Sequence, residues 1–353
     1  MGDLLAVTRD LMAVPSPSRS EAALADLVER ALRACPWLDV ERVGDNVIAR
    51  TACGHSQRLV LAGHLDTVPP IGNEAPRLEG DTLWGVGASD MKGGLAVMLE
   101  LATTVREPTV DVTWCFYARE EIGRADSGLL ELWQQRPDLL AGDAAILGEP
   151  TSALVEAGCQ GTMRVRITVR GVRAHTARPF TGRNAIHRLA PLLQRVAGWP
   201  GREVVLDGCT YAEQLQVVGI EGGVASNVVP DEATVTLNHR YAPDRDAAQA
   251  GAFLLHLLQG SWDAESGDTW EVLDTGDGAP PSLDHPLLRA LVEKSGAAPR
   301  AKVGWTDVAS FWEHGVPAAN FGPGDPLLAH HPDERVSAAQ LERAHDTLLA
   351  LIS

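Results

Sequence analysis

The chain has 353 residues and a net charge of −17, because 47 Asp and Glu outnumber 30 Lys and Arg. Its composition, 45% hydrophobic and 22% charged, is typical of a folded globular protein with room for about two domains. The acidic balance argues against binding to nucleic acid or anionic membranes, because such a field repels phosphate. Five scattered cysteines without C-x-x-C spacing indicate a reducing compartment, and we expect neither a membrane span nor a signal peptide. A cytoplasmic enzyme is therefore expected.

Helix and strand signals alternate in the first half of the chain. Helical spacing of apolar residues predicts helices at 4–13, at 21–34 with Ser20 as N-cap, and at 93–105. Short apolar runs predict strands at 58–62, 110–117 and 143–147. Strands separated by helices predict an α/β fold with a mixed, mainly parallel sheet covered by helices.

The pattern changes near residue 160. Residues 162–170 alternate between apolar and polar side chains, which is typical of an antiparallel strand with one solvated face. Helices at about 184–197 and 246–259 and strands near 215–220 and 233–241 complete a small α+β unit. Beyond 272 helices and short loops return, and the last helix begins at Ser337 with a capping box. We therefore expect one domain from 1–159 and 272–353, interrupted by an inserted domain at 160–271.

Positive charge is concentrated at the start of this insert. Residues 157–202 contain nine arginines and no Asp, Glu or Lys, so this segment carries +9 and the remainder −26. Several of these arginines can be solvated positions on strand and helix faces. The alternative is that the insert presents positive charge to a small anionic ligand.

Candidate metal ligands follow predicted strands or precede a predicted helix. His64 and Asp66 follow the strand at 58–62, at the sheet edge where open α/β sheets place ligands. A carboxylate such as Asp66 can orient a metal-binding histidine. Asp90 precedes the glycines that open the helix at 93–105, where it could bridge two cations or serve as an ordinary N-cap.

Further carboxylates follow the next two strands. Glu120 and Glu121 are adjacent, so their mutual repulsion must be offset, unless they lie in a solvated turn. Glu149 follows the strand at 143–147. A late polar loop contains His330 and His331, and residue chemistry alone does not choose between them. Two imidazoles and three carboxylates suit two divalent ions, zinc above all, with one Glu left to move protons in hydrolysis.

Five sequence motifs then occur in a familiar order. They are G-H-L-D-T-V-P (63–69), G-A-S-D-M-K-G-G (87–94), E-E (120–121), L-G-E-P-T (147–151) and A-H-x-P-D-E (329–334). In this order they resemble the co-catalytic zinc peptidases related to aminoacylase, acetylornithine deacetylase and succinyl-diaminopimelate desuccinylase. Finer motifs, among them E-A-G-C-Q-G (156–161), G-V-R-A-H-T-A-R (171–178) and S-N-V-V-P-D (226–231), resemble the actinobacterial desuccinylases of this family.

The resemblance implies a zinc exopeptidase-like catalytic domain with a ferredoxin-like lid and dimerisation domain. It implies two Zn²⁺ per subunit, for which Co²⁺ can substitute, with Asp90 as the bridging ligand. His64 and Glu149 would complete one metal site, and Glu121 and His330 the other. The family spacing His-x-x-Asp-Glu selects His330 over His331.

The resemblance also assigns the remaining roles. Glu120 would be the general base, and Asp66 would orient His64. His175 would reach the active site of the partner subunit in a homodimer formed by the insert. Substrate contacts would come from Asn227, Arg240, Gly322 and Gly324. Gln160 replaces an arginine of better-known relatives, so Arg178 is expected to bind the acyl carboxylate instead.

The implied substrate is a small anionic molecule, N-succinyl-LL-2,6-diaminopimelate. The implied reaction hydrolyses it to succinate and LL-2,6-diaminopimelate. One alternative is another deacylase of the family, such as acetylornithine deacetylase, or a dipeptidase. A second alternative is a metal-binding scaffold without catalysis.

Overall fold

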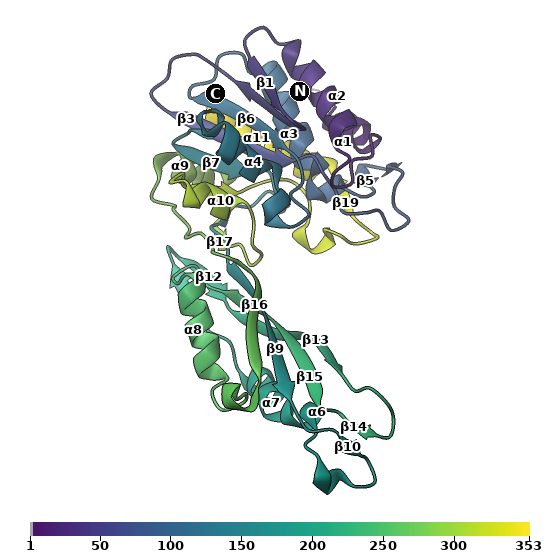
Figure 1. Ribbon diagram of the computed structural model, residues 1–353. Helices are drawn as coiled ribbons and strands as arrows, with labels where there is room; N and C mark the ends of the chain where they lie inside the picture. Colours follow the sequence, from purple (N-terminus) through teal and green to yellow (C-terminus); the bar gives the residue numbers. More distant parts are fainter. Residues whose placement is uncertain (1–2) are drawn as a thin grey trace. The chain divides into compact units, whose positions relative to one another are not determined.

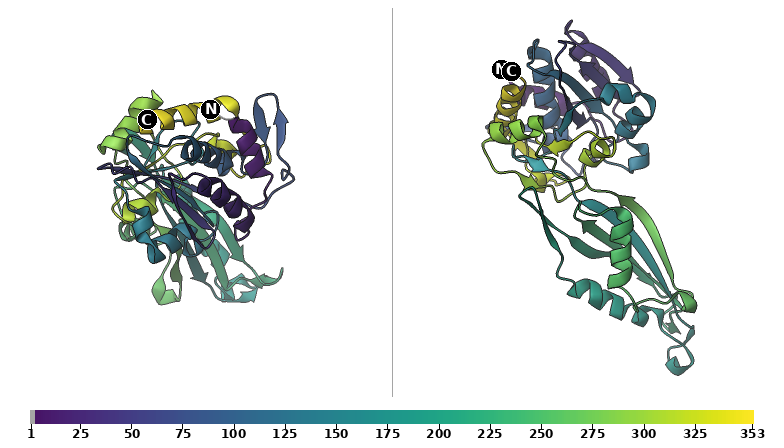
Figure 2. Two further views of the ribbon diagram at one scale, coloured as in Figure 1. Left: turned by 90° about the horizontal axis from the view of Figure 1, so that it is seen from above. Right: turned by 90° about the vertical axis from the view of Figure 1, so that its left-hand side faces the viewer.

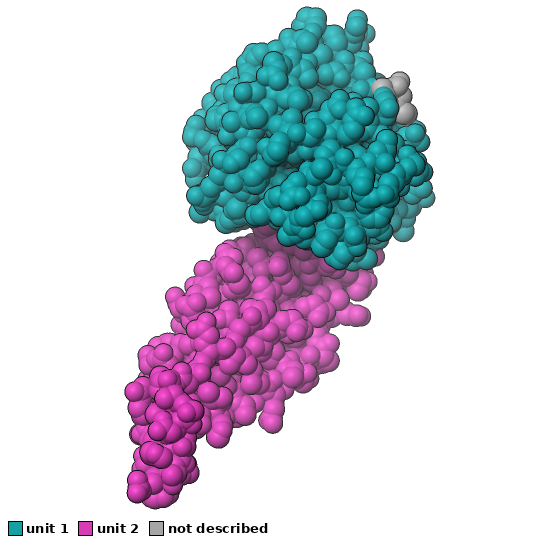
Figure 3. All heavy atoms as spheres, turned by 90° about the vertical axis from the view of Figure 1, so that its right-hand side faces the viewer, with its two compact units in different colours: residues 1–158, 281–300, 310–353 teal, residues 159–280, 301–309 magenta. Residues whose placement is uncertain are grey.

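The computed structural model describes residues 3–353, which form two compact units (Figures 1 and 3). Unit 1 contains the residues up to 158 together with 281–300 and 310–353, and unit 2 contains 159–280 and 301–309. The expected end of the insert at 271 falls inside strand β16 (Thr269–Gly276), which pairs with β9 (Gly161–Arg170). Unit 2 instead extends to residue 280 and also contains 301–309, which no pattern in the sequence indicates.

The centre of unit 1 is an eight-stranded sheet with the order β1-β2-β6-β3-β7-β18-β8-β17. Its strands β6, β3, β7 and β18 run parallel, whereas β1, β2 and β8 pair antiparallel. The mixed, mainly parallel α/β sheet is therefore confirmed. The strands are β1 (Asp39–Val43), β2 (Asn46–Arg50), β3 (Arg58–His64), β6 (Asp111–Tyr117), β7 (Ala144–Leu147), β8 (Glu156–Ala157), β17 (Arg300–Ala301) and β18 (Ala318–Asn320).

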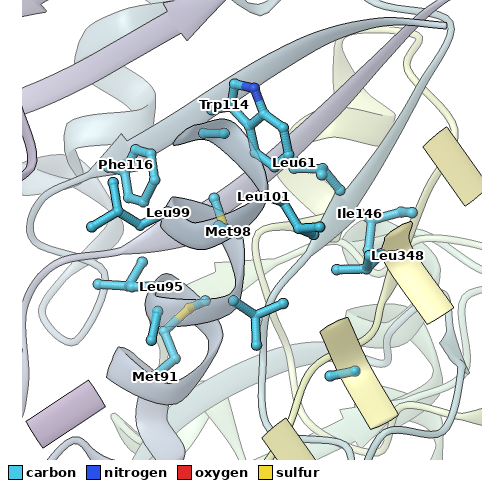
Figure 4. Close-up of a cluster of buried hydrophobic side chains, with 14 of the residues drawn as sticks. Leu61, Met91, Leu95, Met98, Leu99, Leu101, Trp114, Phe116, Ile146 and Leu348 are labelled. Atoms are coloured by element: carbon cyan, nitrogen blue, oxygen red, sulfur yellow. The ribbon is translucent and has the colours of Figure 1, made fainter. Parts of the chain in front are cut away.

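Helix α3 (Gly93–Thr104) is buried on almost every side and fills the core of unit 1. Figure 4 shows its apolar side chains among residues of the sheet and of the last helix, with Leu61, Leu95, Met98, Leu101, Trp114, Ile146 and Leu348 in view. The other helices assigned to this part of the chain are α1 (Leu4–Met12), α2 (Ala22–Arg33), α4 (Gly128–Gln135), α5 (Pro137–Leu140), α9 (Pro286–Ser295), α10 (Val308–Glu313) and α11 (Ala338–Ile352). A small sheet combines β4 (Arg77–Glu79), β5 (Thr82–Trp84) and β19 (Arg335–Ser337).

Two predicted helix starts can be compared with the structure. The capping box of α11 is confirmed, because Ser337 and Gln340 cap each other's backbone N–H groups. The predicted N-cap at Ser20 is wrong: Glu21 occupies that position without capping the helix through its side chain. Its buried carboxylate instead accepts hydrogen bonds from the backbone N–H groups of Arg19 and Arg119.

Unit 2 has a four-stranded antiparallel sheet with the order β13-β15-β9-β16. Along the chain its elements are β9, α6 (Ala185–Arg188), α7 (Ala190–Gly198), β13 (Gln214–Gly222), β15 (Glu232–Tyr241), α8 (Ala247–Leu257) and β16. This is the β-α-β-β-α-β order of ferredoxin-like folds. Figure 2 shows α8 running along the sheet. The hairpins β11–β12 (Glu203–Leu206, Cys209–Ala212) and β10–β14 (Ala174–His175, Val228–Val229) extend the unit.

The alternation predicted for 162–170 is confirmed. Met163, Val165, Ile167 and Val169 are buried in one cluster with residues of α7 and α8, and the arginines between them are exposed. The single helix expected at 184–197 is in fact two, because Pro191 is tolerated only in a first turn and α7 starts just before it. Short 3₁₀ segments lie at Arg124–Asp126, Pro179–Thr181, Ala264–Ser266 and Pro326–Leu328. No helix within residues 3–353 is long and apolar enough to cross a membrane.

Candidate metal centre

Three neighbouring parallel strands bring candidate ligands to one edge of the sheet. His64 is the last residue of β3, Glu120 and Glu121 follow β6, and Glu149 follows β7. Because β6, β3 and β7 are adjacent and parallel, their carboxyl ends meet. Asp90 reaches the same edge from the irregular turn Ala88–Lys92 that precedes α3.

The glycine at position 94 allows the start of helix α3 to lie close to the end of strand β7. A Cβ atom there would lie 2.3 Å from the carbonyl oxygen of Gly148, which is closer than any side chain tolerates. The absence of a side chain lets the first turn of α3 pack directly on the end of β7. The Asp90 turn is thereby held close to Glu149.

Asp90 faces two imidazoles, one with each carboxylate oxygen. Its Oδ1 lies 3.0 Å from His64 Nε2 and its Oδ2 lies 3.5 Å from His330 Nε2. His330 Nε2 is also 2.9 Å from the carboxylate of Glu121. An acid with one oxygen on each imidazole has the geometry that a ligand shared by two cations requires.

Three groups of side chains could each hold a cation. In each group, potential ligand atoms lie within 4.8 Å of one another. Two groups share Asp90, and the third contains Glu120. The groups are His64–Asp90–Glu149, Asp90–Glu121–His330 and His64–Glu120–Glu121. Imidazole and carboxylate donors in these numbers suit divalent metal ions.

His331 lies outside these groups. Its Nδ1 accepts a hydrogen bond of 3.1 Å from the backbone N–H of Asp333, within its own loop. The geometry therefore separates the two histidines that residue chemistry could not.

Asp66 is buried behind the Glu120–Glu121 turn. Its carboxylate accepts hydrogen bonds from the N–H groups of Glu120 (2.9 Å) and Glu121 (3.1 Å) and from the hydroxyl of Ser18 (2.7 Å). Burial would raise its pKa, but the neighbouring His64, the Ser18 hydroxyl and the Glu120 N–H lower the pKa to about 2. The acceptor closest to His64 Nδ1 is the Asp66 carbonyl, at 2.9 Å, whereas its carboxylate lies at 3.5 Å. The carboxylate was expected to orient His64; its hydrogen bonds go to Ser18 and to the glutamate turn, and its part in orienting His64 stays a prediction.

The electrostatics of this edge favour positive charge. Burial lowers the pKa of His64, yet Asp66 and Asp90 together raise it well above its usual value. The hydrogen bond with Glu121 raises the pKa of His330 to about 9. Several carboxylates close together stabilise cations, and bound metal ions would neutralise their negative charge more fully than protons on the two histidines.

Glu334 is a buried acid at this site that sequence reasoning did not select. Its Oε1 accepts hydrogen bonds from the N–H groups of Ser89 and Asp90, both at 2.9 Å. Burial raises its pKa to about 7. Its only signal in the sequence was the last position of the A-H-x-P-D-E motif.

Gly322 and Gly324 are buried rather than open to a ligand. A Cβ on Gly322 would meet the carbonyl oxygens of Gly148 and Glu149, and one on Gly324 would meet Ser89. Gly324 also has a φ of +86°, which favours glycine. The loop they belong to thus packs against the segments that carry Glu149 and Asp90, and their contact with substrate stays a prediction.

The substrate residues expected in unit 2 lie at opposite ends of its sheet. His175 pairs with Val228, and Thr176 N–H donates to the carbonyl of Asn227 at 3.0 Å, so these residues meet at the β10–β14 end (Figure 1). Arg178 donates its N–H to His175 in the same turn. Arg240 pairs with Thr162 and Gln214 at the other end.

Most arginines of residues 157–202 already have acidic partners. Six of the nine form ion pairs inside unit 2: Arg164, Arg166, Arg170, Arg173, Arg188 and Arg202. Among residues 3–353, Arg178, Arg183 and Arg195 form no such pair. Most of the positive charge of residues 157–202 is thus neutralised, but not at these three arginines, one of which is Arg178.

Comparison with known proteins identifies the family. The model of peptidase family M20/M25/M40 matches residues 60–353. The chain belongs to this family. A Mycobacterium tuberculosis protein, provisionally named succinyl-diaminopimelate desuccinylase, is 50% identical over 348 residues, covering 98% of this chain and 97% of its own. The succinyl-diaminopimelate desuccinylase of Corynebacterium glutamicum is 43% identical over 347 residues, covering 97% and 94%. The family expected from the motifs is therefore confirmed.

Solved structures share the fold at low sequence identity. A tripeptidase from Staphylococcus aureus matches with a TM-score of 0.81 and 19% identity, covering 99% of this chain and 97% of its own. The Bacillus subtilis YxeP protein, described as a dinuclear metal-binding peptidase, matches with a TM-score of 0.69 and 18% identity, covering 99% and 96%. At these identities the likeness concerns the fold alone.

Proposed function

We propose that this chain is a dinuclear zinc amidohydrolase that cleaves N-succinyl-LL-2,6-diaminopimelate to succinate and LL-2,6-diaminopimelate. The observation that carries the proposal is Asp90, whose two carboxylate oxygens face two different imidazoles. Relatives of 43% and 50% identity that carry the desuccinylase name support the substrate. A cytoplasmic location fits this biosynthetic role.

One zinc would be held by His64, Asp90 and Glu149, and the other by Asp90, Glu121 and His330. Co²⁺ prefers similar donors and could replace Zn²⁺. When bound, such ions polarise an amide carbonyl and lower the pKa of water. His64 donates its Nδ1–H to the Asp66 carbonyl, which leaves the Nε2 lone pair directed at the metal position.

Glu120 is then the proton carrier. The two groups that share Asp90 are complete without it, yet it lies within ligand distance of His64 and Glu121. Its backbone is fixed by the hydrogen bond to Asp66. From this position Glu120 takes a proton from the attacking water and delivers it to the leaving amine nitrogen.

His175 can donate a hydrogen bond to the developing oxyanion. Its Nδ1 accepts the backbone N–H of Ala177 at 3.0 Å, so the neutral ring carries its proton on Nε2. The Nε2–H of an exposed residue is thereby free to donate to a substrate oxygen. Arg178, three residues on and without an acidic partner in the described chain, is suited to the succinyl carboxylate. Gln160 is not, because it is buried and donates to the carbonyl of Ala212.

The span of the sheet supports a homodimer. From Glu232, near the His175 end, to Arg240 the strand β15 rises by about 26 Å at ~3.3 Å per residue. The backbone of the substrate has about twelve atoms, as long as roughly four extended residues or ~14 Å. One substrate therefore cannot contact His175 and Arg240 of the same chain. We propose that a partner subunit supplies His175 and Asn227.

The edge strand β13 offers a surface for that partner. It is the first strand in the sheet order and contains the exposed apolar residues Val218 and Ile220, and unpaired strand edges favour strand-to-strand association. We therefore propose that unit 2 mediates the dimer.

A kinetic comparison of acyl substrates tests the proposed function. With zinc-loaded protein, kcat/KM for N-succinyl-LL-2,6-diaminopimelate should exceed that for acetylornithine by at least about 100-fold, because an acetyl group offers no carboxylate to Arg178. An equal or higher value for acetylornithine would favour the deacetylase alternative. If metal-loaded protein hydrolysed neither amide, the alternative of a metal-binding scaffold without catalysis would be favoured.

A further inference from the structure

Glu334 connects two segments that carry proposed metal ligands. It lies four residues after His330, and its side chain reaches the Ala88–Lys92 turn that holds Asp90. A single oxygen, Oε1, accepts both the Ser89 and the Asp90 N–H at 2.9 Å. Glu334 is 1% exposed and Ser89 is fully buried, so water does not replace this acceptor.

Other contacts hold the same two segments together. The hydroxyl of Ser89 donates to the carbonyl of Arg335 at 2.7 Å, and Gly85 N–H donates to the carbonyl of Glu334 at 2.9 Å. These bonds dock the two segments, but neither involves the backbone of Asp90 itself. The Glu334 carboxylate, in contrast, binds the backbone N–H of Asp90, the residue whose two oxygens face the two imidazoles.

We infer that Glu334 is a positioning residue that fixes the backbone of Asp90 relative to His330. This inference rests on the proposed two-metal site. A shared ligand must keep one oxygen on each cation, so a small shift of its backbone weakens both metal positions. Partners that orient metal ligands typically contribute about 10–100-fold to metal affinity. The same range is expected for Glu334.

Three substitutions of Glu334 separate the effect of its side-chain length from the effect of its negative charge. Glu334→Ala removes the acceptor, and zinc affinity should fall about 10–100-fold. Glu334→Gln keeps an oxygen at the same reach without the charge, and affinity should stay within about threefold of wild type. Glu334→Asp keeps the charge but shortens the side chain by one methylene, and affinity should fall at least about fivefold. Asp333→Ala, which removes an exposed carboxylate from the same loop, is the matched control.

The measurement is zinc binding to metal-free, full-length protein in competition with a chromophoric chelator. Wild type that binds fewer than two zinc ions would contradict the proposed site itself. Wild type with two ions, and Glu334→Ala with unchanged affinity, would overturn the role of Glu334 alone. If Glu334→Ala does not fold, the Gln and Asp variants decide. Full affinity in Glu334→Asp with weak binding in Glu334→Gln would mean that charge matters and not the two hydrogen bonds.

Discussion

Complementation between two inactive variants tests the partner role of His175. Glu120→Gln removes the proposed base, with an expected loss of about 10²–10⁴-fold. His175→Ala removes one oxyanion donor, with an expected loss of about 10²–10³-fold. Either protein alone should therefore retain at most about 1% of wild-type kcat.

A heterodimer of these chains should recover one active site. The His175→Ala chain supplies an intact Glu120, and the Glu120→Gln chain supplies an intact His175. Random exchange of equal amounts makes about half of all dimers heterodimers, each with one working site of two, so the mixture should reach about a quarter of wild-type activity. His175 must come from the partner subunit because strand β15 spans about 26 Å, which is too far for one chain to place both ends of its unit 2 sheet on one substrate.

The assay is succinate release after subunit exchange, with native mass spectrometry to quantify heterodimers. Recovery should follow the heterodimer fraction as the mixing ratio is varied. Heterodimers present at the statistical fraction with activity still at the level of the parents would refute the reasoning. His175 would then act in its own subunit or have no catalytic part.

Four further predictions concern single side chains. Glu120→Gln should keep both zinc ions, as measured by metal analysis, because Glu120 is not needed to complete either group that shares Asp90; more than a tenth of wild-type rate would show that it is not the base. Asp90→Ala should lose zinc from both positions, whereas His330→Ala should spare the one at His64 and Glu149, and equal losses would contradict a shared Asp90. His331→Ala should bind zinc as wild type does, since its ring bonds within its own loop. In unit 2, burial would raise the pKa of Glu213, but His239, Arg202 and Arg245 lower the pKa to about 2 from an ordinary value of 4.5. This depressed pKa contributes roughly 3 kcal/mol of stability above pH 4.5, which is lost as the pH falls toward 2. Urea unfolding at several pH values should show this loss in the free energy of unfolding of wild type, and a smaller loss in Glu213→Gln. The same pH dependence in both proteins would argue against this role of Glu213.

The elements that alternate or carry long apolar runs could be predicted from the sequence. Strand β9 alternates along its whole length, and the strands β3, β6 and β7 are buried along most of their length. Strand β16 was missed because most of its residues are partly or fully exposed and a bulge between Val272 and Asp274 interrupts its register. The three-residue strands β4, β5 and β19 are too short for periodicity to reveal.

The ligand candidates could be predicted because each follows a recognisable element. Parallel strands deliver their last residues to one edge, which the sequence pattern already implied for His64, Glu120, Glu121 and Glu149. Glu334 and Glu21 could not be predicted, because their acidic side chains bind backbone groups 244 and 98 residues away in sequence. Such a role depends on tertiary contacts that no local pattern records.

Anomalous diffraction from zinc-loaded crystals, recorded on both sides of the zinc absorption edge, tests the two-metal assignment most directly. Two peaks should appear, one among His64, Asp90 and Glu149 and one among Asp90, Glu121 and His330, with Asp90 between them. A peak among His64, Glu120 and Glu121 would contradict the account, because Glu120 would then be a ligand and not the base.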